Sequence, residues 1–265
     1  MKILGIVNIT EDSFSDGGKY LAAEAAIAHA RALAREADIL DLGAASSNPD
    51  AKSVPPDVEI ARLALVVEAL RKDGRSLSID SYAPQVQRWA LAQGVDYLND
   101  IQGFPDAALY PELAASSAKL IVMHAVQERG KAVRIDVSPS EILSRIRRFF
   151  EERIAALTKA GIARDRLILD PGMGFFLGSD PETSFTVLRA LPALKRDFAL
   201  PVLVSVSRKS FLRKAAGVEA ADAGPASLTA ELFAALKGAD FIRTHDPKAL
   251  TGALAVWAAL ARNQA

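Results

Sequence analysis

Short apolar runs recur along the whole chain, and longer segments with a helical pattern lie between most of them. Most of these runs are nearly continuous in Val, Ile and Leu, as expected for parallel strands buried on both faces. The runs cover residues 3–9, 38–44, 76–80, 96–100, 119–124, 167–172, 202–207 and 241–246. The pattern therefore predicts eight strands of one covered, parallel sheet.

Several of the intervening segments are rich in Ala, Leu, Glu and Arg, and the longest carries an apolar stripe. The predicted helices cover residues 22–36, 58–74, 139–161 and 226–239. Gly74 and Gly161 stand at the ends of two of them, where glycine commonly stops a helix.

Eight strands alternating with helices predict a (β/α)8 TIM barrel. The competing fold is a doubly wound open sheet, which usually has fewer strands, and no GxGxxG motif follows the first strand. No linker, low-complexity run or repeat interrupts the chain, so we expect a single domain over residues 1–265.

Composition narrows the class of protein. The 32 Lys and Arg balance the 32 Asp and Glu, so no basic field favours nucleic acid or an anionic membrane. There is no Cys, which excludes disulfides and thiolate catalysis and fits a cytoplasmic setting. No apolar run approaches a membrane span, and the first one reads as a strand rather than a signal peptide. We expect a soluble cytoplasmic protein with small-molecule substrates.

Each predicted strand ends in polar side chains, and in a barrel these ends meet at one mouth. Solvation of loops explains any single one of them. However, Asp80, Asn99, Asp170 and Lys209 lie within or directly after apolar runs, where unpaired polar groups are costly. We therefore expect a site at the mouth. Its further members are Asn8, Thr10, Ser46, Ser47, Asn48, Asp100, His124, Ser207, Arg208, Arg243, His245 and Asp246.

The residue types at this mouth indicate the ligand chemistry. Arg208, Lys209, Arg243 and His245 suit a phosphate or pyrophosphate. The carboxylates and carboxamides suit a flat heterocycle, because a carboxylate accepts N–H bonds from such an edge. No His, Asp or Glu cluster has metal-ligand spacing, but Asn8 can give one oxygen to Mg²⁺ bound to substrate phosphates.

The strand-end motifs, in this order, resemble those of the dihydropteroate synthases over essentially the whole chain. The motifs are GIVNITEDSFSDGG (5–18), LDLGAASSNP (40–49), SIDSY (78–82), LNDIQG (98–103), VMH (122–124), DPGMGF (170–175), SVSRKSF (205–211) and IRTHD (242–246). The resemblance implies a (β/α)8 homodimer, with Mg²⁺, that joins 6-hydroxymethyl-7,8-dihydropterin pyrophosphate to p-aminobenzoate. It also suggests residues 226–262 as the dimer surface.

The resemblance further implies roles for residues in these motifs. Asp80, Asn99 and Asp170 would hydrogen-bond the pterin, and Met123 would line its pocket. Lys209 would contact the pterin and the aminobenzoate region. Asn8, Arg243 and His245 would hold pyrophosphate, with Asn8 near the metal, and Ser47 would lie beside p-aminobenzoate. The expected substrate-binding set also includes Ser46, Phe175, Phe176, Ser207 and Arg208.

An SN1-like path fits this inventory. Pyrophosphate leaves from a CH₂ group next to an electron-rich pterin, and the arylamine captures the resulting cation. The protein must then stabilise a departing anion and a developing cation. Arg243 and His245 suit the first task, and Asp80 and Asp170 suit the second.

Two loops depart from the family pattern. Ala45 and Asn48 stand where the family usually has Glu and Arg, and the loop after Asp170 is longer, lacks a Lys and carries an extra Phe176. Both departures resemble the sulfonamide-insensitive, transferable branch of the family. Phe176 is then either a bulky obstacle to sulfonamides that still admits p-aminobenzoate or a packing residue under the loop.

Two other functions stay open. A pterin-binding methyltransferase would share the pterin-facing Asp and Asn residues but would not need a pyrophosphate site, so the SRKS and RTHD motifs favour the synthase. A non-catalytic pterin-binding paralogue is compatible with the altered loops. The presence of Asn8, Lys209, Arg243 and His245 argues against it.

Overall fold

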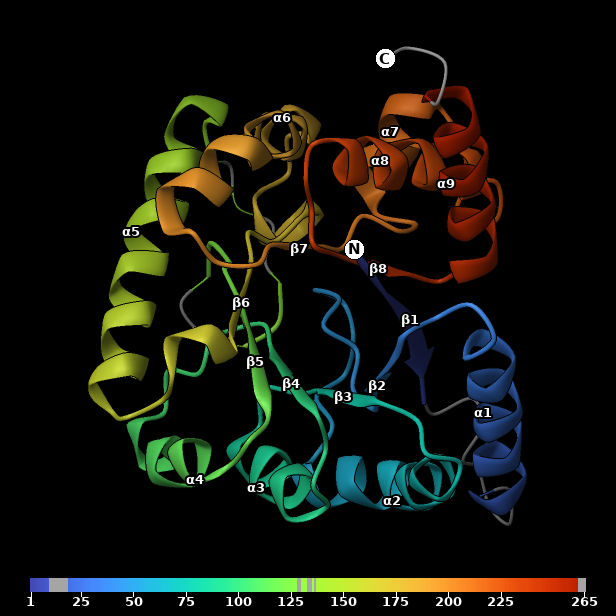
Figure 1. Cartoon of the computed structure of the whole chain (residues 1–265), viewed down its shortest axis with the longest axis vertical. Helices are drawn as coiled ribbons and strands as arrows, with labels where there is room; N and C mark the ends of the chain where they lie inside the picture. Colours follow the sequence, from blue (N-terminus) through green and yellow to red (C-terminus); the bar gives the residue numbers. More distant parts are fainter. Residues whose placement is uncertain (10–18, 128–129, 133–134, 136, 262–265) are drawn as a thin grey trace.

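Eight strands form the centre of the molecule, and helices surround them in the order of the chain (Figure 1). This computed structural model describes residues 1–9, 19–127, 130–132, 135 and 137–261. Thr10 and most of the first loop motif therefore lie outside the described residues. None of the helices within the described ranges is long and apolar enough to cross a membrane.

The strands are short and all of them pair in parallel. They are β1 Lys2–Asn8, β2 Ile39–Gly43, β3 Leu77–Asp80, β4 Tyr97–Asp100, β5 Lys119–Met123, β6 Leu167–Asp170, β7 Leu203–Val204 and β8 Phe241–Thr244. Their order is β6-β5-β4-β3-β2-β1-β8-β7. Strands that follow one another in sequence are therefore neighbours in the sheet everywhere except between β6 and β7, where a seam remains.

The seam between β6 and β7 is closed by a single bridge between Leu169 and Val202. The N–H of Leu169 also donates to the carbonyl of Pro201 at 2.9 Å. The ring of strands therefore returns on itself, which confirms the predicted (β/α)8 barrel. The alternative of an open, doubly wound sheet is wrong.

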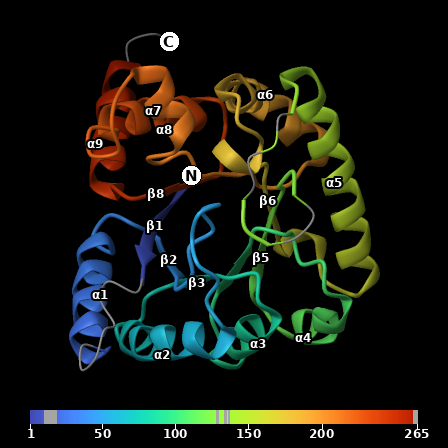
Figure 2. The same cartoon turned by 180° about the vertical axis from the view of Figure 1, so that it is seen from behind.

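The outer layer contains the four predicted helices, with bounds shifted by a few residues, and others that the pattern did not identify. They are α1 Lys19–Leu33, α2 Pro56–Lys72, α3 Pro84–Ala92, α4 Tyr110–Ala115, α5 Pro139–Lys159, α6 Pro181–Phe198, α7 Ser210–Ala216, α8 Gly224–Leu236 and α9 Pro247–Ala261. Helices α3, α4 and α7 have only 9, 6 and 7 residues, too few to show a clear period. Figure 2 shows this layer from behind.

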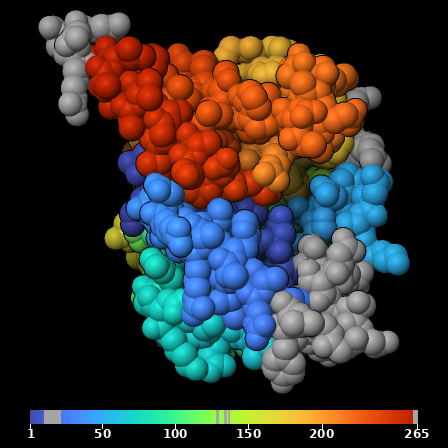
Figure 3. Space-filling view, turned by 90° about the vertical axis from the view of Figure 1, so that its right-hand side faces the viewer, coloured from blue at the N-terminus to red at the C-terminus, as the bar shows by residue number. Residues whose placement is uncertain are grey.

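The last helices form a cap of their own on one side of the barrel. In Figure 3, the orange and red surface of the chain's C-terminal part lies over the blue surface that contains α1. Helix α8 packs on α9 and on β8, so this cap is tied directly to the last strand. This arrangement places α8 beside β8, the strand that carries Arg243 and is followed by His245.

A small apolar cluster fills the interior of the barrel at the amino ends of the strands. It contains one residue from each of seven strands: Leu4, Ile39, Tyr97, Ile121, Ile168, Leu203 and Phe241. A much larger cluster lies between the strands and the helices. The barrel is therefore packed and not a pore, and its other end is free to hold polar groups.

Candidate active site

The polar layer of the barrel follows from the two-residue repeat of a strand. Side chains at positions i and i+2 face the same way, so the residue two places after each member of the apolar cluster also faces the interior. This rule leads from Ile39 to Asp41, from Tyr97 to Asn99, from Ile121 to Met123, from Ile168 to Asp170 and from Phe241 to Arg243. The strand register therefore brings carboxylates, an amide and a guanidinium together above the apolar cluster.

Arg243 connects two carboxylates at the centre of this layer. Its Nε donates to Asp41 Oδ2 at 2.5 Å, and Nη2 donates to Asp80 Oδ2 at 2.7 Å. The Nδ2 of Asn99 lies 3.4 Å from the same Asp41 oxygen. Burial opposes the charge on Arg243, but the two carboxylates outweigh it and raise the pKa of the guanidinium. Arg243 is thus a permanent cation held between Asp41 and Asp80.

Asp41 is the functional candidate that sequence reasoning missed. It lies in the middle of the run DILDLGA and is completely buried. The sequence feature that could have identified Asp41 is a charged residue inside an otherwise apolar strand, because a buried charge needs a partner. Within the described part of the chain, Asp41 Oδ1, Asn99 Oδ1 and Ser78 Oγ have no hydrogen-bond partner. Unpaired acceptors of this kind suit a ligand that presents N–H groups.

A cavity of about 480 Å³ opens above the polar layer. On the side of the first strands it is lined by Asn8, Ser46, Ser47 and Asp80, with the family departures Ala45 and Asn48 beside them. From the loop after β6 and from the ends of β7 and β8 it is lined by Phe175, Phe176, Ser207, Arg208, Lys209, Arg243 and His245. Twelve of the predicted residues, with Asn48 among them, thus line one cavity.

Three of the residues expected to contact the substrates do not line this cavity. Asn99, Asp170 and Met123 are buried, with relative exposures of 3%, 2% and 5%. They belong to the polar layer and its edge, and Asp170 is close enough to Lys209 and Arg243 for their charges to affect its pKa. Burial raises the pKa of Asp170 to about 6 and outweighs these cations.

The loop after β6 passes very close to the end of β5. Gly172 has a φ of +74°, and a Cβ at this position would lie 2.3 Å from the backbone oxygen of His124. Only glycine fits both the conformation and the space. The N–H of Gly172 donates to Asp170 Oδ1 at 2.8 Å, which orients the carboxylate. The Pro-Gly turn therefore positions the strand-end aspartate.

Lys209 joins this loop to the cation-rich side of the cavity. Its Nζ donates to the carbonyl of Met173 at 3.1 Å and lies 4.8 Å from the ring centroid of Phe176. Burial lowers the pKa of Lys209 to about 8, against the attraction of Asp170. The side chain therefore spans the space between the buried carboxylate and the aromatic wall.

Phe176 has both a packing side and a cavity side. It is 7% exposed and packs with Ile101, Met123 and Ala132, while it also lines the cavity. Its carbonyl accepts the N–H of Val126 at 2.9 Å, which ties the loop to the segment after β5. Of the two expectations for Phe176, packing is confirmed. Because the ring also lines the cavity, this packing is compatible with contact between Phe176 and a ligand.

The ends of β7 and β8 carry the remaining cations and are joined to each other. The N–H of His245 donates to Ser207 Oγ at 3.2 Å. Arg208 is exposed and has a φ of +58°, an uncommon conformation for a residue with a side chain. Burial and the neighbouring cations lower the pKa of His245 to about 4, so its ring is neutral at pH 7.

Some strand-end residues expected at the site are structural. Asp100 and His124 do not line the cavity described above, because adjacent residues of a strand face opposite sides of the sheet. Asn99 faces the barrel interior, so Asp100 faces outward, and the same alternation separates Met123 from His124. Asp246 lies in the loop after β8 and borders the α8–α9 surface instead.

Comparison with known proteins agrees with this site. Residues 4–245 match the family described as pterin binding enzyme. The chain is 62% identical to the dihydropteroate synthase type-2 of Escherichia coli, over 97% of this chain and 95% of that protein.

Two solved structures are similar over nearly the whole chain. The dihydropteroate synthase of Xanthomonas albilineans with 4-aminobenzoic acid has a TM-score of 0.88 and 37% identity, covering 98% of this chain and 93% of that one. The synthase of Anaplasma phagocytophilum with bound 6-hydroxymethylpterin-monophosphate has a TM-score of 0.85 and 34% identity, with 98% of both chains covered. The chain therefore belongs to the pterin-binding enzyme family and, within it, to the dihydropteroate synthases, which are transferases.

Proposed function

We propose that this barrel joins 6-hydroxymethyl-7,8-dihydropterin pyrophosphate to p-aminobenzoate and releases 7,8-dihydropteroate and pyrophosphate. In this reaction the bond from the pterin CH₂ to the pyrophosphate oxygen breaks, and a bond to the arylamine nitrogen forms with loss of one proton. The observation that carries the proposal is one cavity lined by Arg208, Lys209, Arg243 and His245, directly next to buried carboxylates. The ligands in the two similar structures support the same substrates.

The polar layer would bind the pterin. Asp80, Asn99 and Asp170 offer acceptors to its N–H groups, and the unpaired Oδ1 of Asp41 adds another. The carboxylates would also stabilise the positive charge that develops on the ring as pyrophosphate leaves, because fixed charges act strongly in a water-poor site. Met123, buried at the edge of this layer, would contact the pterin through its apolar side chain.

The β7–β8 side of the cavity would hold the pyrophosphate. Arg208 and Arg243 supply positive charge, and the Nδ1 of His245 has no hydrogen-bond partner within the described residues. A neutral imidazole there can donate an N–H hydrogen bond to a departing phosphate oxygen. Lys209 would lie between this group and the pterin, with Ser46, Ser47, Phe175 and Phe176 around the incoming arylamine.

The site fits Mg²⁺ only as a metal bound mainly by the substrate. No group of three or more His, Asp or Glu within the described ranges could hold a metal ion. Asn8 is exposed at the end of β1 and lines the cavity, so its oxygen can join phosphate oxygens around the ion. When bound, the metal would neutralise charge on the leaving pyrophosphate.

The direct test measures pyrophosphate release by the purified protein with the pterin pyrophosphate, Mg²⁺ and p-aminobenzoate. We expect release that requires p-aminobenzoate. A methyltransferase would bind the pterin and release no pyrophosphate. It would also have no use for a cation-rich cavity. Pterin binding without turnover, despite p-aminobenzoate and Mg²⁺, would instead identify a non-catalytic paralogue.

We also propose that Phe176 makes the enzyme insensitive to sulfonamides. The ring forms part of the cavity wall beside Lys209, where it can obstruct a ligand bulkier than p-aminobenzoate. Discrimination by one apolar group is worth about 10- to 200-fold. Phe176→Ala should therefore lower the inhibition constant of sulfamethoxazole by about that factor and change the KM for p-aminobenzoate less.

Phe198→Ala is the matched control, because Phe198 packs on Phe150 and does not line the cavity. Both truncations remove a buried ring and both should reduce stability by about 3–5 kcal/mol. Only the Phe176 variant should become sensitive to the sulfonamide. Equal inhibition of the wild type and Phe176→Ala would reduce Phe176 to a packing residue.

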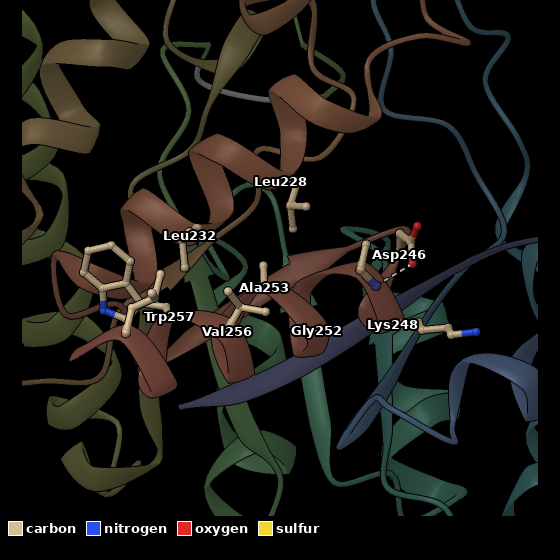
Figure 4. Close-up of a pocket in the computed structure, with 10 residues that line it drawn as sticks. Leu228, Leu232, Asp246, Lys248, Gly252, Ala253, Val256 and Trp257 are labelled. Carbon is tan, nitrogen blue, oxygen red and sulfur yellow. Dashed lines mark hydrogen bonds between the residues drawn. The ribbon is translucent and has the colours of Figure 1, made fainter. Parts of the chain in front are cut away.

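We propose that two copies of the chain associate through α8 and α9. Figure 4 shows Leu228 and Leu232 of α8 beside Ala253, Val256 and Trp257 of α9. Val256, Trp257 and Leu260 are 62%, 44% and 65% exposed, an unusual concentration of large apolar side chains on one face. A second copy of the same face is a self-complementary occupant, as in most two-fold dimers.

Light scattering after size exclusion tests this dimer. Val256→Asp should convert the dimer to a monomer, because a carboxylate in an apolar interface is costly. Leu65→Asp is the control, since Leu65 is an exposed leucine on α2, away from this face. A wild-type monomer, or a Val256→Asp dimer as stable as the wild type, would contradict the proposal.

A further inference from the structure

Helix α2 carries two buried charged residues that have no place in the chemistry above. Glu59 and Arg62 are only 4% and 6% exposed, and neither lines the cavity. They stand three residues apart and therefore lie on the same face of the helix. Buried charges are costly unless hydrogen bonds stabilise them, so their partners indicate their role.

The partner of Glu59 is Ser81, the residue directly after Asp80. Ser81 Oγ donates to Glu59 Oε2 at 2.9 Å, and the same hydroxyl oxygen accepts the N–H of Ala83 at 3.2 Å. A hydroxyl group has one hydrogen to donate and lone pairs to accept, so it can make both bonds at once. The carboxylate of α2 is thus joined to the chain at the end of β3.

The backbone of Ser81 is held as well. Its N–H donates to the carbonyl of Asn99 at 3.1 Å, and its carbonyl accepts a hydrogen bond from Gln87 Nε2 at 2.8 Å. Partners from β4, α3 and α2 therefore meet at this one residue, and Glu59 supplies the partner from α2. Because Asp80 is the preceding residue, these bonds fix the position from which its carboxylate reaches the cavity.

Arg62 makes a comparable contact with the end of β2. Its Nη1 donates to the carbonyl of Ala44 at 2.9 Å. Ala44 is completely buried and leads into residues 45–48, which line the cavity. The charge of Arg62 also favours the ionised form of Glu59, although burial is the larger effect and raises the pKa of this carboxyl group. One face of α2 therefore holds two neighbouring strand ends of the site.

We propose that Glu59 is a positioning residue that holds the end of β3, and with it Asp80, in the geometry that binds the pterin. Its effect reaches the ligand through the hydroxyl group of Ser81 and the peptide that joins Ser81 to Asp80. This inference rests on the proposed function, in which Asp80 accepts N–H groups of the pterin and stabilises the charge that develops on its ring.

The test compares two substitutions of similar size. Glu59→Gln keeps a carbonyl oxygen that can accept the Ser81 hydroxyl, whereas Glu59→Met fills the space with only a weak acceptor. We expect Glu59→Met to weaken the binding of 6-hydroxymethylpterin, measured by calorimetry, and to lower kcat. Each loss should be about 10- to 100-fold, since a misplaced binding group can cost up to about 100-fold. Binding of inorganic pyrophosphate should change little, and Glu59→Gln should retain pterin binding.

Ser81→Ala provides a second variant if Glu59→Met folds poorly, because it removes the donor of the same hydrogen bond. Since Glu59 and Ser81 act through one contact, the loss in the double variant should be smaller than the sum of the two single losses. Glu68→Met is the matched control. Glu68 also lies on α2, where it forms an exposed ion pair with Lys72, so this variant should bind the pterin like the wild type.

The outcomes separate this inference from the proposed function. Pyrophosphate release by the wild type decides the proposed function, and the pterin affinity of the variants decides the role of Glu59. A folded Glu59→Met with the pterin affinity and kcat of the wild type would refute the positioning role. Equal losses of pterin and pyrophosphate affinity would also refute it, because they would indicate a general loss of structure.

Discussion

Asp80 and Asp100 end neighbouring strands of the barrel, and only Asp100 has its hydrogen bonds satisfied by the scaffold without a ligand. Asp100 is 1% exposed and accepts hydrogen bonds from the side chain of Gln87 and the N–H groups of Gln102 and Phe104, at 2.7–3.0 Å. Asp80 lines the cavity and is paired with Arg243, which it shares with Asp41. Burial raises the pKa of both carboxyl groups, so an unusual pKa does not distinguish them.

The two histidines that follow β5 and β8, His124 and His245, differ in the same way. Burial lowers the pKa of both His124 and His245 to about 4. The Nδ1 of His124 lies 3.2 Å from the carbonyl of Pro171, and its ring packs edge-on against Phe149. His245 lines the cavity and its Nδ1 is unpaired within the described residues. Position in the cavity, together with unpaired atoms, separates the site from the scaffold, whereas burial alone does not.

Arg243 should give the largest effect, because it joins the site to the buried Asp41. Arg243→Met leaves a fully buried carboxylate without its cation, which typically costs about 3–5 kcal/mol. Pyrophosphate release should also fall by about 100-fold or more, since a charged contact in the transition state is lost. Urea unfolding and the pyrophosphate assay measure the two effects.

Arg88→Met is the control for this variant, since Arg88 forms an exposed ion pair with Glu112. Such surface pairs contribute about 0–1 kcal/mol, so its stability and activity should stay close to the wild type. If the two arginine variants were equally stable, Arg243 would not be the cation that Asp41 requires.

Asparagine substitutions should separate the structural role of Asp100 from the functional role of Asp80. Asp100→Asn places an amide against the donors of Gln87, Gln102 and Phe104, and it should lose about 1–3 kcal/mol of stability. Its kcat should stay close to that of the wild type. Asp80→Asn should unfold at nearly the wild-type urea concentration but lose most of its activity. The reverse pattern would overturn the division between site and scaffold.

The smallest effect concerns the pH dependence of stability through His124. Its folded pKa of about 4 lies below the unfolded value of about 6.5, so the unfolded chain binds the extra proton between these pH values. Stability from this group is therefore lost as the pH falls and gained as the pH rises. Between about pH 5 and pH 6.5, the wild type should gain about 1.5 kcal/mol more than His124→Gln.

Urea titrations at several pH values measure this difference. The His124→Gln variant should still bind pyrophosphate, because His124 does not line the cavity, whereas His245→Gln should bind it more weakly. Parallel pH curves for the wild type and His124→Gln would show that the buried ring does not control this part of the stability.

Much of the fold could be predicted from the sequence because the signals for strands and helix ends are local. A run such as LIVM or LILD forms a buried strand wherever it lies, and a proline or glycine next to a helix marks its end for steric reasons. Gly172 is of this kind, since its positive φ follows from the Pro-Gly turn. The short helices α3, α4 and α7 were not predicted because a few residues do not display a period. Helices α6 and α9 were also not predicted, although they have 18 and 15 residues.

The sequence by itself determined the eight strands, the order of the motifs and the concentration of polar groups at strand ends. It did not determine which of two adjacent polar residues faces inward, as with Asn99 and Asp100, because that choice depends on strand register. Only the closed barrel brought Arg243 to Asp41 and Asp80, which lie 202 and 163 residues away in the chain. Pairings of this kind depend on distance in space, and a linear pattern contains no measure of that distance.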